Sequence, residues 1–291
     1  MAGTKINNTD KSIIEKTPDG TIELKITIPW NTVKKTWDIV VAEMVKNSNL
    51  PGFRKGKAPK KLIEEKLNKA KIKEEVLRQL LPSAYIEAVK EQSLKPIMDP
   101  KIHLEGELLE EKGWQFHALT CEAPEVNLNG YKEVIKKITA KSKIIVPGKD
   151  LPAGRQELEA PKFEEIVKTL LDSVRISIPR ILTEREADRL LSQMLDEIKR
   201  LGMTLDQYLS STGKKPEDLR AEYANKAQND LKLEFALQKV AESEKITVDD
   251  AEIEKTIENA KPEEKQSLRN NKYLLASIIR QQKTLDFLKS L

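Results

Sequence analysis

Cysteine, histidine and aromatic residues are scarce in this 291-residue chain, and each scarcity excludes some classes of protein or site. Cys121 is the single cysteine, so no disulfide can form within the chain, which agrees with a reducing compartment. No apolar run approaches the roughly 20 residues that cross a bilayer, and the first residues hold no hydrophobic signal core. We therefore expect a cytoplasmic protein without a membrane partner.

Motifs of catalysis are also missing from the sequence. It has no glycine-rich phosphate loop, no Ser-His-Asp arrangement and no cysteine close to a histidine. The two histidines, His103 and His117, fall on predicted strands without further ligands at metal-binding spacing, so we interpret them as residues of a sheet surface. We expect no catalytic residue, no cofactor and no metal.

The composition favours a helix-rich, heavily solvated protein. Charged residues make up 34% of the chain, apolar residues 38% and aromatic residues only 4%, which predicts thin cores and much exposed surface. The length is sufficient for two domains that each bury a core.

The first half carries the pattern of an α+β domain, an antiparallel sheet with helices. Residues 11–29 read as a hairpin, because apolar and polar residues alternate after the turn residues Pro18, Asp19 and Gly20. Helical spacing predicts helices over residues 30–46, 60–68 and 72–92, and strand patterns return over residues 96–128. Pro82 should bend the helix that contains it.

Residues 50–59 form a predicted loop with a ring and cations at its tip. Two glycines and two prolines exclude a continuous helix or strand there. Phe53 is adjacent to Arg54 and Lys55, with Lys57 close by, so an aromatic ring and three positive charges are presented together. An exposed phenylalanine between cations has little structural use, and the tip is typical of a binding surface.

The charge around this loop indicates a polyanionic partner. Residues 46–73 contain ten Lys or Arg and two Glu, an excess of eight positive charges in a chain whose net charge is +4. Such an excess attracts a polyanion in a salt-dependent way, and RNA or an RNA-rich particle is the leading candidate. For residues 60–73 alone, a solvated helix face is the alternative interpretation.

The second half follows the helical period to its end. Before it, residues 141–161 contain three prolines and two glycines without a steady period, which predicts a linker. Gly202 is a predicted helix C-cap, and Thr204 with Gln207 has the spacing of a capping box.

The loop sequence Gly52-Phe53-Arg54-Lys55-Gly56-Lys57-Ala58-Pro59 resembles the ribosome-binding signature of trigger factor, a family of bacterial chaperones. The resemblance extends over residues 11–140 and 162–291. It implies a ribosome-binding domain over residues 1–140, the linker 141–161, and an all-α chaperone domain with extended helical arms over residues 162–291. It also implies an ATP-independent chaperone that docks on the large ribosomal subunit near the tunnel exit and shields nascent polypeptides. The ribosome-binding residues that it implies are Gly52, Phe53, Arg54, Lys55, Gly56, Lys57 and Pro59.

The linker departs from the family pattern. Trigger factors usually carry an FKBP-like prolyl isomerase domain at this place, and such a domain needs on the order of 100 residues. Residues 141–161 cannot hold one, so this sequence resembles a form without that domain, and we expect no isomerase activity. A refolding assay limited by proline isomerisation would decide.

Apolar residues of the second half are candidate contacts to unfolded polypeptides, the clients of a chaperone. The alternative for each of them is a place in the hydrophobic core. The candidates are Met194, Met203, Tyr208, Tyr223, Phe235 and Tyr273.

Two other functions remain open from the sequence. One is a prolyl cis/trans isomerase. The other is an RNA-binding ribosome-assembly factor, which tight binding to naked RNA would favour. Whether free molecules form a homodimer is also open.

Overall fold

A computed structural model describes residues 12–47, 69–106, 108–141 and 163–291. The chain divides into two compact units. Unit 1 comprises residues 1–123 with 179–181, and unit 2 comprises residues 124–178 with 182–291.

The sheet of unit 1 is antiparallel, with the strand order β1-β2-β4-β3. In β2, every second residue is buried, as its alternating sequence predicts. Lys25 of β2 lies opposite His117 of β4, which in turn lies opposite His103 of β3. The strands are β1 (Ile13–Lys16), β2 (Thr21–Ile28), β3 (Lys101–Glu105) and β4 (Trp114–Cys121).

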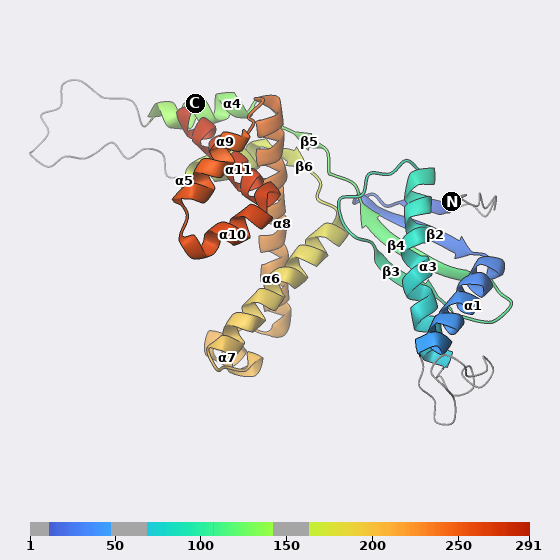
Figure 1. The fold of residues 1–291 in the computed structure, drawn as a ribbon. Coiled ribbons are helices and arrows are strands. Elements are labelled where there is room, and N and C mark those ends of the chain that lie inside the picture. Colours follow the sequence, from blue (N-terminus) through green and yellow to red (C-terminus); the bar gives the residue numbers. More distant parts are fainter. Residues whose placement is uncertain (1–11, 48–68, 107, 142–162) are drawn as a thin grey trace, which may run out of the picture. The chain divides into compact units, whose positions relative to one another are not determined.

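Two helices, α1 (Trp30–Asn47) and α3 (Lys69–Glu91), pack on one face of this sheet (Figure 1). Their buried stripes and the apolar residues of β2 and β4 form a single core, with Leu24 and Phe116 almost completely buried. The predicted helices over residues 30–46 and 72–92 are thus confirmed. The second continues through Pro82, and the predicted helix over residues 60–68 lies outside the described residues.

The predicted turn between β1 and β2 is also confirmed. Gly20 has a φ of 86°, a conformation that glycine adopts without strain. Asp19 accepts hydrogen bonds from the Thr17 hydroxyl, from the Thr21 backbone N–H at 3.3 Å and from the Arg180 backbone N–H at 3.2 Å. The Thr17 hydroxyl is the main cause that lowers the pKa of Asp19.

Unit 2 is built mainly of helices. A short antiparallel pair, β5 (Val126–Asn127) with β6 (Arg175–Ile176), adds to the predicted all-α architecture. The helices are α4 (Tyr131–Lys141), α5 (Phe163–Ser173), α6 (Arg180–Arg200), α7 (Leu205–Thr212), α8 (Pro216–Ser243), α9 (Asp250–Asn259), α10 (Pro262–Asn270) and α11 (Lys272–Ser290).

Helix α4 packs in unit 2, although the sequence groups it with the first domain. Tyr131 and Ile135 are buried against α5, α8 and α11. The Tyr131 hydroxyl donates to Glu244 at 2.9 Å, and Lys132 Nζ lies 2.7 Å from the same carboxylate. The division by packing therefore falls at residue 123, whereas the sequence placed the first boundary at residue 140. The predicted linker 141–161 lies outside the described residues, apart from Lys141.

Helices α6, α7 and the first half of α8 form a helical arm. Its apolar residues, among them Met194, Ile198 and Leu219, make small clusters separate from the larger core. The arm turns at the predicted caps. Gly202 has a φ of 72° and Met203 N–H donates to the Ile198 carbonyl at 3.1 Å, while Thr204 and Gln207 form a capping box.

The second half of α8 belongs to the body of unit 2. Its residues Ala236, Leu237 and Val240 pack with α4, α5 and the end of α11. A further cluster joins α9 to the start of α11 through Ile253, Ile257 and Leu275. No helix in the described part of the chain is both long and apolar enough to cross a membrane.

Candidate functional site

The predicted binding loop, residues 52–59, lies outside the described residues. The structure describes its two supports, because α1 ends at Asn47 and α3 begins at Lys69 at the same end of the helical layer (Figure 1). Both helices are held by the core of unit 1.

A groove of about 700 Å³ lies in unit 2 between α8, α11 and the connection that follows α8. Helix α8 contributes positions 234, 237, 238 and 241, and α11 contributes positions 273, 274, 276, 277, 280, 281 and 284. In both helices these positions recur every three or four residues and so share one face. The lining residues are Glu234, Leu237, Gln238, Ala241, Ile246, Thr247, Val248, Tyr273, Leu274, Ala276, Ser277, Arg280, Gln281 and Thr284.

Small side chains on both helices explain why this space is not filled. Ala241 of α8 is buried, and Ala276 and Ser277 of α11 line the same groove. Side chains that end at Cβ or one atom beyond it leave room between two packed helices that a leucine would occupy. The groove is thus a consequence of residue size at a few helical positions.

Large apolar side chains are exposed beside the groove. Tyr273 is 92% exposed, Leu274 60% and Ile278 54%. Single exposed apolar residues are ordinary, but three within six residues of one helix, two of them lining a groove, make this a candidate binding surface.

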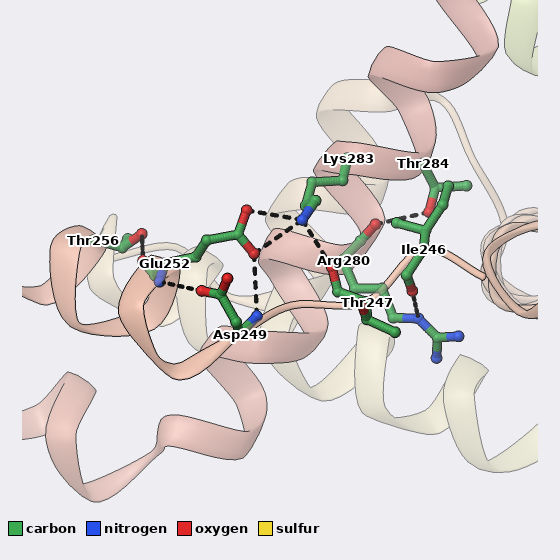
Figure 2. Close-up of polar contacts among 8 residues, drawn as sticks. All are labelled: Ile246, Thr247, Asp249, Glu252, Thr256, Arg280, Lys283 and Thr284. Atoms are coloured by element: carbon green, nitrogen blue, oxygen red, sulfur yellow. Dashed lines mark hydrogen bonds and ion pairs between the residues drawn. The ribbon is translucent and has the colours of Figure 1, made fainter. Parts of the chain in front are cut away.

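The connection after α8 is fastened to α11 by hydrogen bonds to its backbone (Figure 2). Arg280 Nε donates to the Ile246 carbonyl at 2.9 Å, and Lys283 Nζ donates to the Thr247 carbonyl at 2.7 Å. Lys283 Nζ also contacts both carboxylate oxygens of Glu252 at 2.8 and 2.9 Å. These bonds fix one wall of the groove relative to the other.

Glu252 has a second role at the start of α9. Its side chain accepts from the Asp249 backbone N–H at 3.2 Å, and its own N–H donates to Asp249 Oδ1 at 2.8 Å, which completes a capping box (Figure 2). The hydrogen bond from Lys283 is the main cause that lowers the pKa of Glu252. The carboxylate therefore stays charged and joins α9 to α11.

Helix α8 ends at a residue in the left-handed backbone conformation, which directs the chain into the connection that forms one wall of the groove. Lys245 has a φ of 54°, and Ile246 N–H donates back to the Ala241 carbonyl at 2.8 Å. Together with the bond from Lys245 N–H to the Glu242 carbonyl at 3.2 Å, this is a Schellman ending of α8. It turns Ile246 into the groove.

The six predicted client contacts lie in different places. Met194 is 7% exposed in the core of the arm, and Met203, Tyr208 and Tyr223 pack half-buried against that core. Phe235 is half-buried on α8. Of the six, only Tyr273 lines the groove.

Leu274, Ile278 and Arg280 were not identified as candidate site residues from the sequence. The available signal was the apolar run at the start of α11 next to the small residues Ala276 and Ser277.

The two histidines lie on the sheet of unit 1, as predicted. His117 Nδ1 contacts Glu23, and His117 Nε2 lies 2.8 Å from Glu105 Oε2. The hydrogen bond with Glu23 is the main cause that raises the pKa of His117, and Glu105 adds to it. Among the residues that the structure describes, no cluster of His, Cys, Asp or Glu could hold a metal ion.

Family models match both halves of the chain. The model described as bacterial trigger factor protein (TF) matches residues 11–147, and the model described as bacterial trigger factor protein (TF) C-terminus matches residues 153–290. The two matches follow each other with only residues 148–152 between them. An inserted isomerase domain of on the order of 100 residues has no room there.

Curated relatives agree with this result. The trigger factor of Corynebacterium aurimucosum is 29% identical over 196 residues, 67% of this chain and 41% of that protein. The trigger factor of Rhodococcus opacus is 34% identical over 128 residues, 43% of this chain and 26% of that protein. The trigger factor of Staphylococcus aureus strain JH9 is 35% identical over 109 residues, 38% of this chain and 25% of that protein. Each alignment thus spans less than half of the relative.

A solved structure has the same fold with a TM-score of 0.64 and 17% identity, over 96% of this chain and 99% of that chain. It is described as "Promiscuous Substrate Recognition in Folding and Assembly Activities of the Trigger Factor Chaperone". An α+β unit followed by a helical unit with an open groove defines a two-part protein, and the exposed apolar side chains beside the groove make it a candidate binding surface. The chain belongs to the trigger factor family, in a form without the middle isomerase domain.

Proposed function

We propose that this protein is an ATP-independent chaperone that docks on the large ribosomal subunit near the tunnel exit and shields nascent polypeptides. Membership of the trigger factor family supports the proposal. The single observation that carries it is the exposed apolar surface of α11, where Tyr273, Leu274 and Ile278 lie beside the groove.

Such a surface holds unfolded chains without nucleotide. Unfolded polypeptides expose apolar side chains, and covering them in the groove removes apolar area from water at about 25 cal/mol per Å². The charged residues that make up 34% of the sequence keep the chaperone itself in solution.

Docking on the ribosome makes weak contacts sufficient. Residues 52–59 bring a ring and three cations, of which Arg54 and Lys55 suit RNA phosphates or acidic side chains and Phe53 suits a small apolar recess. A chaperone tethered near an emerging chain meets it at a high effective concentration.

An aggregation assay without ATP tests the chaperone function. The chain should suppress aggregation of a denatured, diluted client protein. The double variant Tyr273→Ser with Leu274→Ser should need several-fold more protein for the same suppression, because it removes apolar area from the groove. The control is Leu201→Ser, since Leu201 is 73% exposed but does not line the groove. Equal suppression by both variants would contradict the assignment of this surface, and no suppression by the unchanged chain would contradict the function.

A further inference from the structure

Resting on the proposed function, the structure also indicates which segments the groove prefers. We propose that the groove of α8 and α11 binds apolar polypeptide segments that carry an aspartate or glutamate, with the carboxylate held by Arg280.

The geometry of Arg280 supports a carboxylate as its partner. Its Nε donates to the Ile246 carbonyl at 2.9 Å, which holds the guanidinium at the groove wall. Figure 2 shows the two terminal nitrogens pointing away from this contact. Within the described part of the chain, no carboxylate is paired with these nitrogens. A guanidinium that is held through Nε and has both terminal NH2 groups available suits bidentate binding of a carboxylate.

The other charged groups near the groove do not take this role. Lys283 is occupied by Glu252 and by the Thr247 carbonyl. Glu234 lines the groove from α8, but the charges that act on it are those of Glu186 and Arg189 on α6. Arg280 therefore remains an uncompensated positive charge at the groove.

The dimensions of the groove define the spacing that a ligand needs. Tyr273 and Arg280 are seven residues apart on α11, which is about 10 Å at 1.5 Å per residue. An extended segment covers that distance in about three residues, and a helical segment covers it in about two turns. The preferred segment thus carries an apolar anchor for Tyr273 and Leu274 and a carboxylate about 10 Å away from it.

Labelled peptides test the preference directly. Three ten-residue peptides share the same leucine and phenylalanine anchors and differ at one position three residues from an anchor, which is Glu, Gln or Lys. Fluorescence anisotropy with the full chain should show the Glu peptide binding roughly tenfold more tightly than the Gln peptide, since charge-assisted hydrogen bonds are about twice as strong as neutral ones. The Lys peptide should bind more weakly than the Gln peptide.

Substitutions of Arg280 test whether its guanidinium causes the preference for the Glu peptide. Arg280→Gln should remove the difference between the Glu and Gln peptides. Because Arg280 also holds the Ile246 carbonyl at the groove wall, the readout is the ratio of the two affinities within the variant and not either affinity alone. Arg280→Lys should keep part of the difference, because it retains the charge but not the planar fork. Arg269→Gln is the matched control, since this arginine of α10 does not line the groove, and it should keep the full preference. Circular dichroism confirms that each variant is folded.

Several results would overturn the inference. They are equal binding of the Glu and Gln peptides, a preference that survives Arg280→Gln, and displacement of the Glu peptide by an RNA oligonucleotide at equal concentration. Peptide binding that disappears as the chain dimerises in analytical ultracentrifugation would assign the groove to a second copy instead. The aggregation assay does not use these peptides. If the chain suppresses aggregation but binds the Glu and Gln peptides equally, this inference is contradicted and the proposed chaperone function is not.

Discussion

His117 shows how a single side chain ties three strands of the sheet together. It lies on β4 and contacts Glu23 of β2 and Glu105 of β3. Its neighbours across the ladder are Lys25 and His103. Both carboxylates favour the protonated ring, which is why the pKa of His117 is raised.

The raised pKa predicts a pH dependence of stability. A pKa that is higher in the folded state contributes stability fully below the unfolded value of about 6.5, and the contribution is lost as the pH rises through the folded value. We expect the free energy of unfolding of unit 1 to fall from pH 6 to pH 8 by at most about 1 kcal/mol, because Glu105 is largely exposed.

Urea unfolding at both pH values measures this difference. His117→Gln should remove it, and His103→Gln, at the exposed histidine of β3, should leave it unchanged. An undiminished pH difference in His117→Gln would show that other groups cause it.

The sequence predicts contacts between residues that are close in the chain, but not contacts between distant ones. The capping box of Thr204 and Gln207 was predictable because both residues lie within one helical turn. The contacts of His117 were not, because Glu23 is 94 residues away in the chain and meets the ring only through the register of β2 and β4. A strand pattern shows which face a residue takes but not its neighbour on the next strand.

Among the helices, α8 has an ending that the sequence does not favour. Lys245 takes the left-handed conformation that glycine usually supplies at this position. The strain costs about 1 kcal/mol for a residue with a Cβ.

Lys245→Gly should therefore stabilise the protein by about 0.5 kcal/mol, since relief of strain exceeds the extra freedom that glycine gives the unfolded chain. The midpoint of urea unfolding, followed by circular dichroism, measures the change. Lys239→Gly, at an exposed position inside the same helix, is the control and should destabilise by about 1 kcal/mol. A lower midpoint for Lys245→Gly would refute the argument.

The helices themselves were predictable from their apolar periodicity, and their partners were not. Helix α4 has an amphipathic pattern that fits either unit, and the contacts of Tyr131 with Glu244 place it in unit 2. The pair β5 and β6 has two residues in each strand, too few for an alternating pattern to be recognised. The groove likewise requires the pairing of α8 with α11, which no local pattern specifies.

For the whole molecule, the basic loop leads to a prediction about ribosome binding. Changing Phe53, Arg54 and Lys55 together to alanine should reduce cosedimentation with ribosomes at least tenfold, because it removes the ring and two of three tip cations. Binding by the unchanged chain should weaken as salt is raised.

The matched control removes positive charge elsewhere. Lys199 and Arg200 at the end of α6, changed to alanine, should leave cosedimentation unchanged. Far-UV circular dichroism should be the same for all three proteins. Ribosome binding that the triple alanine variant retains would exclude the loop as the main contact.

At this scale the order of the two parts and the missing isomerase domain could be predicted. The short, proline-containing stretch after residue 140 leaves no room for a further core, and the adjacent family matches agree. The exact division of the chain could not be predicted, because residues 124–141 belong to unit 2 through contacts with residues more than 100 positions later. One such contact joins Lys132 to Glu244.

Helix α8 is shared between two hydrophobic clusters. Its 28 residues extend for about 42 Å, with Leu219 and Ala227 in the arm and Leu237 and Val240 in the body. Because one continuous helix carries residues of both the arm and the body, the backbone hydrogen bonds of α8 join the arm to the body although their apolar clusters are separate. Since the clusters of the arm are smaller than the core of the body, we expect amide hydrogen exchange to be faster in the arm than in the second half of α8.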